Sequence, residues 1–238
     1  IIGAGSNLLV RDNGFDGLII KLGRNFNKIK LKNNKLSVGA GVLDTNLSKF
    51  TLKNSIKDFE FFSGIPGTVG GAIKMNAGCY GSETADNLNS VLLINKLGKI
   101  KSLNSNKLNL KYRSSSIDEN SIILQGNFKF VFATKSEILD KINYIKNKRL
   151  LSQPIKEKTS GSTFKNPQGE YASVLIEKAG CKGMQIGGAL VSSVHSNFII
   201  NKGNATALDI ENLGKTIIDR VKNKFGIKLE WEIKIIGN

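Results

Sequence analysis

The segment Ser63–Ala72 constrains the fold most, because it places four glycines and a proline within ten residues. Proline fixes its own backbone angle, and each glycine admits conformations that other residues avoid. Glycine at so many positions lets the backbone approach a flat or phosphorylated ligand closely, and we favour this interpretation over a purely structural loop. No Gly-Lys-Ser/Thr follows at the required spacing, which excludes the phosphate loop of nucleotide triphosphatases.

A second glycine loop, Gly3-x-Gly5-Ser6-Asn7, follows the apolar residues Ile1 and Ile2. Its bare N–H groups could hold pyrophosphate oxygens, although a loop of this kind alone is more often a structural turn. Position 8 is leucine, so the loop is not the dinucleotide-binding fingerprint. The chain opens inside an apolar stretch without a starting methionine, and we expect it to be a fragment of a longer protein.

The charge is strongly positive, with 35 Lys and Arg against 19 Asp and Glu, a net charge of +16. Such a balance is typical of nucleic-acid-binding proteins. The lysines are scattered, however, and the chain is also rich in Ile and Asn, so a solvated basic surface is the favoured interpretation. The alternative interpretation is a functional one, in which the basic surface attracts ligands with phosphates or carboxylates.

The rare residues limit the chemistry. One His and two Cys exclude most protein metal sites, so we expect no metal. Cys79 and Cys181 form no Cys-x-x-Cys pair and are expected to be free thiols. Any redox reaction therefore needs an organic cofactor. No apolar stretch is long enough to span a membrane, and we expect no membrane partner.

Strands and helices alternate irregularly, which predicts an α+β fold. Asn33-Asn34 and Leu97-Gly98 predict hairpin turns. The strands expected from apolar runs are Ile1-Ile2, Leu8–Val10, Leu18–Lys21, Ile29–Leu31, Leu36–Val38, Val91–Ile94, Ile100–Leu103, a pair formed by Ile122–Leu124 and Phe128–Phe132, and Ile227–Ile236. The expected helices are Asp44–Lys53, one that begins at the capping box Thr134-x-x-Glu137 and reaches about Leu151, Glu170–Ala179, and Thr206–Phe225.

Three glycine-containing segments, Gly3–Leu8, Ser63–Ala72 and Asn76–Gly81, resemble the FAD-binding segments of the UDP-N-acetylenolpyruvoylglucosamine reductase family. Later segments match the same family in order and extend the resemblance over essentially the whole chain: Tyr112–Ser114, Gly161–Pro167, Lys182–Gly188 and Leu229–Glu232. The interval between Arg113 and Ser162 is short, and its only tyrosine, Tyr144, lies on a predicted helix. The chain therefore resembles the shorter type, which lacks a tyrosine lid loop.

The resemblance implies two domains. Residues 1–148 would form an FAD-binding domain of the vanillyl-alcohol-oxidase/PCMH type, with its N-terminal part missing. Residues 149–238 would form an α+β substrate domain whose last strand returns to the active site. The predicted boundary lies near residues 146–155.

The resemblance further implies a cytoplasmic, monomeric enzyme of peptidoglycan precursor synthesis. A non-covalent FAD would take hydride from NADPH and reduce the enolpyruvyl double bond of a UDP-sugar. The residues expected to contact FAD are Gly3, Gly5, Ser6, Asn7, Ser63, Gly64, Pro66, Gly67, Thr68, Gly70, Gly71, Ala77, Gly78 and Gly81.

Three residues match catalytic positions of the family. Ser162 would donate a proton, Arg113 would pair with the substrate carboxylate, and Glu232 would stabilise or relay the proton. Without the resemblance, Ser162 indicates only a serine in a turn and Arg113 only a surface arginine. Glu232 and Glu230 then indicate two carboxylates on one face of a strand. Ser162-x-x-Lys165 also matches the Ser-x-x-Lys of penicillin-binding enzymes, but no Ser-Asp-Asn follows it.

The resemblance implies substrate contacts by Lys165, Asn166, Lys182 and His195. A lone histidine is otherwise more often a structural hydrogen-bonding residue. Two other functions stay open: another FAD oxidoreductase of the same fold, and a basic nucleic-acid-binding module. The second leaves the glycine loops unexplained, and 7% aromatic residues provide no rich stacking surface. We therefore expect no nucleic-acid partner.

Overall fold

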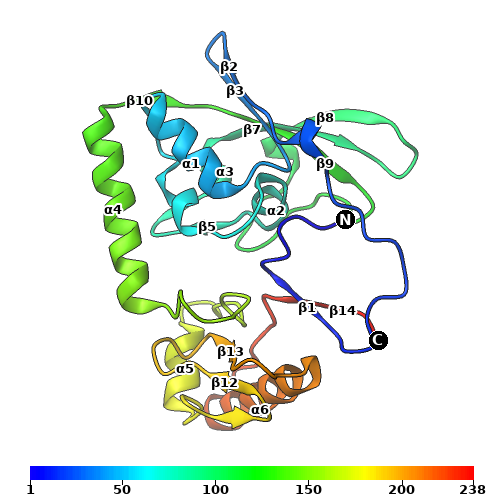
Figure 1. Ribbon diagram of the computed structural model, residues 1–238, viewed down its shortest axis with the longest axis vertical. Coiled ribbons are helices and arrows are strands. Elements are labelled where there is room, and N and C mark those ends of the chain that lie inside the picture. Colours follow the sequence, from blue (N-terminus) through cyan, green and yellow to red (C-terminus); the bar gives the residue numbers. More distant parts are fainter. The chain divides into compact units, whose positions relative to one another are not determined.

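The computed structural model describes all residues, Ile1–Asn238, and the chain divides into two compact units (Figure 1). Unit 1 comprises residues 1–5 and 19–148, and unit 2 comprises residues 6–18 and 149–238. The sequence led us to expect two uninterrupted ranges. Residues 6–18 instead belong with the C-terminal part, because strand β1 (Leu8–Val10) pairs in parallel with strand β14 (Lys234–Ile236).

Unit 1 is built on a five-stranded antiparallel sheet with the order β2-β3-β9-β7-β8. Its strands are β2 (Ile29–Lys32), β3 (Lys35–Gly39), β7 (Leu88–Ile94), β8 (Ile100–Asn104) and β9 (Ile122–Phe128). Both predicted hairpins are confirmed. Asn33 and Asn34 have φ of 50° and 54°, which are the left-handed angles that a two-residue hairpin turn demands and that asparagine tolerates.

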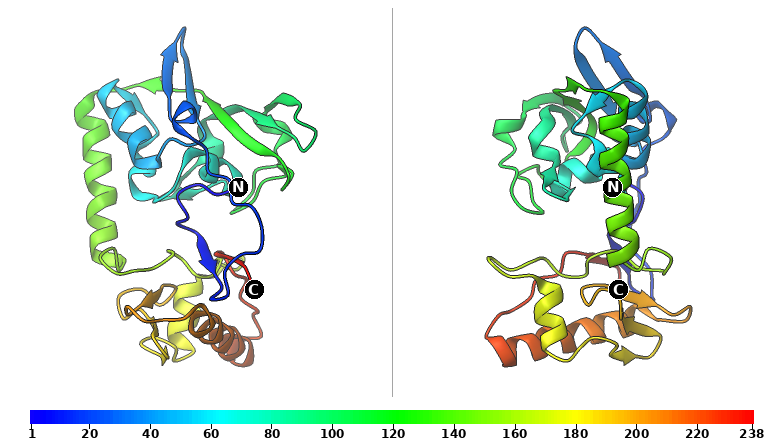
Figure 2. Two further views of the ribbon diagram at one scale, coloured as in Figure 1. Left: turned by 45° about the vertical axis from the view of Figure 1, so that its right-hand side comes forward. Right: turned by 90° about the vertical axis from the view of Figure 1, so that its left-hand side faces the viewer.

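The α-helices of unit 1 lie on one side of this sheet (Figures 1 and 2). They are α1 (Asp44–Lys53), α2 (Val69–Met75), α3 (Thr84–Asn87) and α4 (Lys135–Ser152), with short 3-10 helices at Arg24–Phe26, Glu60–Gly64 and Ser105–Lys107. Phe59, Phe61 and Phe62 are fully buried between α1 and the sheet and form the centre of the core. The predicted start of α4 is confirmed, since the Glu137 N–H donates to Thr134 Oγ1 over 3.2 Å.

Three predictions of strands in unit 1 were wrong. Ile1-Ile2 and Leu18–Lys21 form only one isolated bridge, between Ile2 and Lys21. The expected pair within 122–132 does not form, because β3 and β7 already occupy both edges of β9. β10 (Val131–Phe132) pairs with β4 (Ile56–Lys57) instead. A further small hairpin joins β5 (Gly78–Cys79) to β6 (Ser82–Glu83).

Unit 2 packs two helices against a three-stranded antiparallel sheet. The elements are α5 (Ala172–Lys178), α6 (Ala207–Phe225), β11 (Gln185–Ile186), β12 (Ala189–Val191) and β13 (Ile199–Asn201). Thr206 caps α6 in a reciprocal capping box with Asp209, and Gly226 ends it in the left-handed conformation with φ of 73°. Local sequence signals therefore position α6 as predicted.

The expected continuous strand Ile227–Ile236 is broken in two. Trp231 pairs with Phe164, whereas only Lys234–Ile236 form a strand, which pairs with β1. The two halves have different partners, so the segment bends between them. The Trp231 ring packs on Gly214 of α6, where a Cβ atom would lie only 1.9 Å from the indole.

Cys79 and Cys181 are free thiols, as expected. The structure contains no helix with the length and apolar character needed to cross a membrane.

Asp44 is a buried carboxyl group in the first turn of α1. It is 0% exposed, and neither carboxylate oxygen has a hydrogen-bond partner. Burial raises the pKa of the Asp44 carboxyl well above its usual range. The folded state therefore favours the neutral acid, and ionisation of Asp44 opposes folding at neutral pH.

The substitution Asp44→Asn is expected to stabilise the protein by roughly 1–3 kcal/mol at about pH 8 and to change little near pH 4. A carboxyl group with a raised folded pKa contributes its full stability below its unfolded pKa, and this contribution disappears as the pH rises through the folded pKa. Urea denaturation at several pH values measures this, with the exposed Asp140→Asn as the matched control. Equal pH dependence of the wild type and Asp44→Asn would contradict the assignment.

Candidate functional site

The glycine-rich loop of unit 1 is fixed by backbone hydrogen bonds to the segment Ala40–Asp44. Val69 N–H donates to the Val42 carbonyl and Gly70 N–H to the Ala40 carbonyl, both over 2.9 Å. A Cβ atom on Gly70 would lie 2.9 Å from that of Ala40. Glycine at position 70 is therefore needed for the close approach of two backbone segments.

The start of α2 is satisfied within the protein. Thr68 is its N-cap, and Thr68 Oγ1 accepts from the Gly71 N–H over 3.4 Å. By contrast, no backbone hydrogen bond uses the N–H groups of Gly3, Ala4 or Gly5. Gly3 stands directly against Thr68, since a Cβ atom there would lie 2.4 Å from Thr68 Oγ1. Unused backbone donors thus lie beside the glycine-rich loop.

A pocket of about 480 Å³ lies within unit 1 at this place. Its size is in the range of ordinary ligand sites. The lining residues combine apolar, glycine and basic groups: Ile1, Ile2, Gly3, Ala4, Lys21, Leu22, Asn27, Ala40, Gly41, Leu43, Thr68, Gly70, Gly71, Lys74, Glu119, Ser121, Ile122 and Ile123. Four of the residues predicted to contact FAD are therefore in the wall: Gly3, Thr68, Gly70 and Gly71.

The space around Gly71 indicates whether a cofactor fits in this pocket. A Cβ atom on it would meet no protein atom closer than 3.7 Å, and its helical backbone does not require glycine. Glycine nevertheless costs about 1 kcal/mol relative to alanine inside a helix. The space beside Gly71 is therefore available to a group other than the protein. The free N–H groups, Lys21 and Lys74 suit the phosphates of FAD, and the apolar wall suits a flat ring.

The other residues predicted to contact FAD do not line this pocket. Gly5, Ser6 and Asn7 follow Gly3 along the chain, and Ser63, Gly64, Pro66 and Gly67 precede Thr68. Ala77, Gly78 and Gly81 lie in and around the β5–β6 hairpin. A Cβ atom on Gly78 would lie 2.5 Å from the Ser82 carbonyl oxygen, so glycine there permits the strand pairing. The FAD contacts of these ten residues stay predictions.

Arg113 is positioned against the β5–β6 hairpin. Its Nη2 donates to the Gly78 carbonyl over 3.0 Å, and its guanidinium lies 5.0 Å from the centre of the Tyr112 ring. Arg113 also has a positive φ of 53°, an uncommon backbone conformation for a side chain of this size. The structure thus brings the predicted catalytic arginine to a segment predicted to bind FAD.

Sequence reasoning missed Asn76 as the anchor of this arrangement. Asn76 is fully buried and caps the C-terminus of α2 with φ of 42°. Its amide donates to the Lys111 carbonyl over 3.2 Å and accepts from the Ala85 N–H over 2.9 Å. Asn76 therefore connects the segment that resembles an FAD-binding segment to the chain just before Arg113. Only its place at a helix end, where asparagine is favoured, could have indicated this role.

In unit 2, the segment Ser162–Lys165 runs between two other extended segments. Thr163 N–H donates to the Asn197 carbonyl over 2.8 Å, and Glu232 N–H donates to the Thr163 carbonyl over 2.9 Å. Ser162 itself pairs with Phe198. The structure thereby brings Ser162 and Glu232, which are far apart in sequence, onto adjacent segments on either side of Thr163.

Asn197 holds this arrangement together and was also missed from the sequence. Its Nδ2 donates to the Phe164 carbonyl over 2.7 Å, and its Oδ1 accepts from the Phe164 N–H over 2.9 Å. The side chain is only 3% exposed. It acts as the missing strand partner of Phe164 and fixes the backbone two residues after Ser162.

The four predicted substrate-binding residues all have partners. Lys165 Nζ lies 3.1 Å from Glu230, and Lys182 Nζ lies 2.9 Å from Glu177. The hydrogen bond and charge of Lys182 lower the pKa of the Glu177 carboxyl. The partners of the other two side chains are backbone groups: Asn166 Oδ1 accepts from the Ala172 N–H at the start of α5, and His195 Nδ1 accepts from the Asn197 N–H.

His195 lies in a turn against the ring of Phe198, with 4.7 Å between the ring centres. Burial lowers the pKa of its imidazole, which favours the neutral form at physiological pH. A neutral imidazole that accepts at Nδ1 carries its proton on Nε2. His195 can therefore offer a hydrogen-bond donor without a charge.

Comparison with known proteins gives consistent results for both parts of the chain. Residues 1–104 match the family model described as FAD binding domain. Residues 153–236 match the model described as UDP-N-acetylenolpyruvoylglucosamine reductase, C-terminal domain.

Two relatives and one solved structure carry the same description. The UDP-N-acetylenolpyruvoylglucosamine reductase of Rickettsia conorii is 48% identical over 235 residues, which cover 99% of this chain and 80% of the relative. That of Rickettsia prowazekii is 46% identical over the same shares. A crystal structure of the enzyme from Thermus caldophilus aligns with a TM-score of 0.88 and 36% identity, covering 98% of this chain and 84% of that one.

Proposed function

Since the chain belongs to the family of UDP-N-acetylenolpyruvoylglucosamine reductases, we propose that it performs the reaction of that family. It reduces the enolpyruvyl ether of UDP-N-acetylglucosamine to UDP-N-acetylmuramate, with FAD and NADPH, in peptidoglycan precursor synthesis. The observation that carries the proposal in unit 1 is the pocket beside Gly71, next to the unused N–H groups of Gly3–Gly5. FAD held there would supply the transfer of an electron pair from NADPH to the substrate.

The residues of the chain must hold the substrate and deliver one proton. We propose that the Arg113 guanidinium pairs with the substrate carboxylate, onto which negative charge spreads when the neighbouring double bond is reduced. The Ser162 hydroxyl then gives its proton to the carbon next to that carboxylate. Glu232 lies one segment away from Ser162 and supports or relays this proton.

The charged side chains of unit 2 suit the nucleotide part of the substrate. We propose that Lys165 and Lys182 exchange their exposed carboxylate partners, Glu230 and Glu177, for phosphate oxygens. Exposed ion pairs of this kind contribute at most about 1 kcal/mol, so the exchange costs little. Asn166 and His195 would add neutral hydrogen bonds. We further propose that the enzyme acts as a monomer in the cytoplasm and has no nucleic-acid partner.

An anaerobic visible spectrum tests the function. FAD, NADPH and the enolpyruvyl ether of UDP-N-acetylglucosamine are added to the purified protein in that order. We expect the flavin absorption to bleach on addition of NADPH and to recover on addition of the ether. Bleaching without recovery would indicate another FAD oxidoreductase of the same fold, and it would overturn the assigned substrate.

Leucine at position 71 is expected to weaken FAD binding by roughly tenfold to a hundredfold, because its side chain fills space needed by the cofactor. Leucine favours a helix more than glycine, so α2 is retained. Flavin fluorescence titration measures the affinity and circular dichroism checks the fold. Gly71→Ala, which adds one methyl group, is the graded control with a smaller effect. Wild-type affinity in folded Gly71→Leu would exclude this part of the pocket as the FAD site.

A further inference from the structure

The α-helices of unit 1 leave one face of its sheet uncovered, and we call it the outer face; only the 3-10 helix Arg24–Phe26 lies against it, at Gly39. It is defined by one row of residues in register across all five strands: Lys30, Ser37, Asn127, Ser90 and Asn104. The α-helices of unit 1 lie on the opposite side (Figures 1 and 2). Lys30 and Asn104 at the two edges of the row are exposed, Ser37 and Asn127 are half-buried, and Ser90 is buried.

The centre of the outer face is polar and internally bonded. Ser37 Oγ donates to Asn127 Oδ1 over 2.8 Å, and Asn127 Nδ2 donates to Ser90 Oγ over 3.1 Å. The row offers neither a cavity nor a buried polar atom in search of a ligand. A partner of this face would consequently be an extended surface and not a small ligand held in a cavity.

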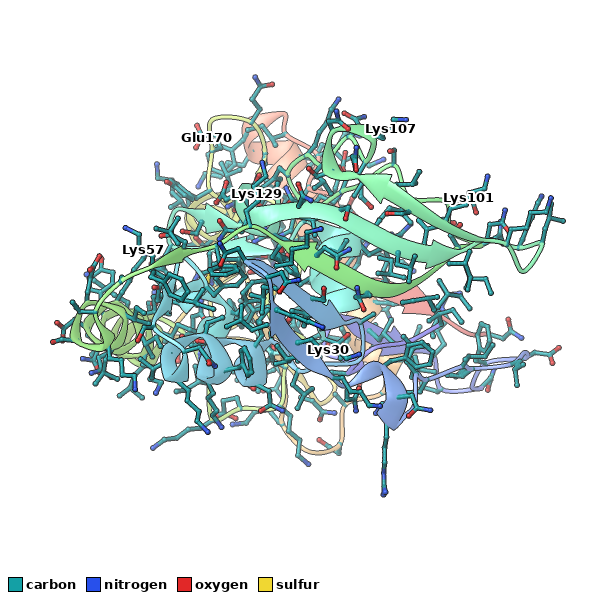
Figure 3. All side chains as sticks on the ribbon, turned by 90° about the horizontal axis from the view of Figure 1, so that it is seen from above. Lys30, Lys57, Lys101, Lys107, Lys129 and Glu170 are labelled. Carbon is teal, nitrogen blue, oxygen red and sulfur yellow. The ribbon has the colours of Figure 1, made fainter.

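Lysine is the only charged residue type on the sheet. Its five strands and the two hairpin turns contain no Asp or Glu. The lysines on the strands, on the turns and directly beside them are Lys28, Lys30, Lys32, Lys35, Lys96, Lys99, Lys101, Lys107 and Lys129. None of these forms an ion pair, whereas lysines elsewhere in the chain do. Lys30, Lys32 and Lys35 share the face of the row, whereas Lys101 pairs with the buried Leu93 and lies on the other face of its strand. Figure 3 looks onto the sheet and labels Lys30 and Lys101.

The tip of the β7–β8 hairpin adds an apolar element to this charge. Leu97 is 70% exposed and Ile100 is 62% exposed. Lys96, Lys99 and Lys101 alternate with them along the turn. Two apolar side chains among ammonium groups match the boundary between lipid headgroups and acyl chains.

We propose that the outer face docks on an anionic lipid bilayer. The lysines contact lipid phosphates, and Leu97 and Ile100 enter the interface, so the protein binds at the surface without spanning the membrane. The earlier expectation of no membrane partner rested on the lack of a spanning segment and does not bear on surface binding. A nucleic acid fits less well, because the face exposes no aromatic side chain for base stacking. A second copy of this chain also fits less well, because two such faces in contact would bring like charges together.

Sedimentation with vesicles tests the proposal on the FAD-loaded protein. We expect binding to phosphatidylcholine vesicles that contain about 40% phosphatidylglycerol, and none to pure phosphatidylcholine. Binding should weaken strongly between about 0.05 M and about 0.3 M salt. Equal binding to both kinds of vesicle, or no binding to either, would overturn the proposal.

Two sets of variants locate the contact. The triple variant Lys30→Gln, Lys32→Gln, Lys35→Gln, whose residues share the face of the row, should bind about a hundredfold more weakly, at about fivefold per lysine. The matched variant Lys49→Gln, Lys53→Gln, Lys135→Gln loses the same charge from the helices and should bind like the wild type. The double variant Leu97→Asn, Ile100→Thr should bind about tenfold more weakly to vesicles.

Duplex DNA distinguishes a membrane surface from a general polyanion. DNA at an equal phosphate concentration should not displace the protein from the anionic vesicles. Displacement by DNA, together with unchanged vesicle binding of Leu97→Asn, Ile100→Thr, would overturn the membrane assignment and indicate a nucleic-acid surface.

Discussion

Alanine at position 162 is expected to lower turnover of the enolpyruvyl ether about a thousandfold, in the range of a lost general acid. The Ser162 hydroxyl is the proposed source of the proton that completes the reduction. It lies on an extended segment bonded on both sides, to Asn197 through Thr163 and to Glu232. Its removal should therefore leave the backbone in place and abolish only the proton transfer.

The two half-reactions separate this role from a structural one. In Ser162→Ala, NADPH should bleach the flavin at nearly the wild-type rate, while recovery on addition of the ether becomes slow. Stopped-flow absorbance measures both steps. Ser160→Ala is the matched control, because Ser160 is two residues away and its hydroxyl donates to the Leu8 carbonyl over 3.3 Å. Normal recovery in Ser162→Ala would exclude this serine as the proton donor.

Replacing Asn197 by alanine is expected to cost roughly 3 kcal/mol of unfolding free energy. The substitution removes both partners of the Phe164 backbone, and it leaves a buried N–H and a buried carbonyl without hydrogen bonds. Each group of this kind costs about 1–3 kcal/mol. No other side chain is bonded to these two atoms.

Chemical denaturation of the full chain measures this loss. Asn223→Ala, at an exposed position on α6, is the control and should change the free energy of unfolding by less than about 0.5 kcal/mol. A similarly small change in Asn197→Ala would mean that water or a backbone shift satisfies Phe164. The bidentate contact would then not hold the Ser162 segment in place.

The elements that the sequence predicted well have strong local signals. Thr206 and Asp209 at one end of α6 and Gly226 at the other define that helix by contacts within a few residues. Asn33-Asn34 likewise determines its hairpin through its own backbone preference. No comparable local signal tells β10 to pair with β4, because that pairing depends on which edges of the sheet are already occupied.

For the candidate site, too, the sequence predicted local features but not contacts between distant residues. Sequence motifs indicated the glycine-rich loop as a whole, but they treated Gly70 and Gly71 alike. Only the three-dimensional contacts separate them, since Gly70 is crowded by Ala40 and Gly71 is not. Asn197 and Asn76 were missed because each bonds to backbone atoms distant in sequence, where no pattern of residue types reveals the contact.

The pairing of β1 with β14 has a consequence for folding during synthesis. Asn7 donates to the carbonyl of Glu232, which is synthesised 225 residues later. While the ribosome produces unit 1, the strand Leu8–Val10 has no partner and presents an open edge. Unit 2 is thus interrupted in the sequence by residues 19–148 of unit 1, and it is completed only after these have been made. The time for which Leu8–Val10 stays unpaired depends on the speed of translation. This speed, and the binding of chaperones to the unpaired strand, should therefore govern the yield of native protein.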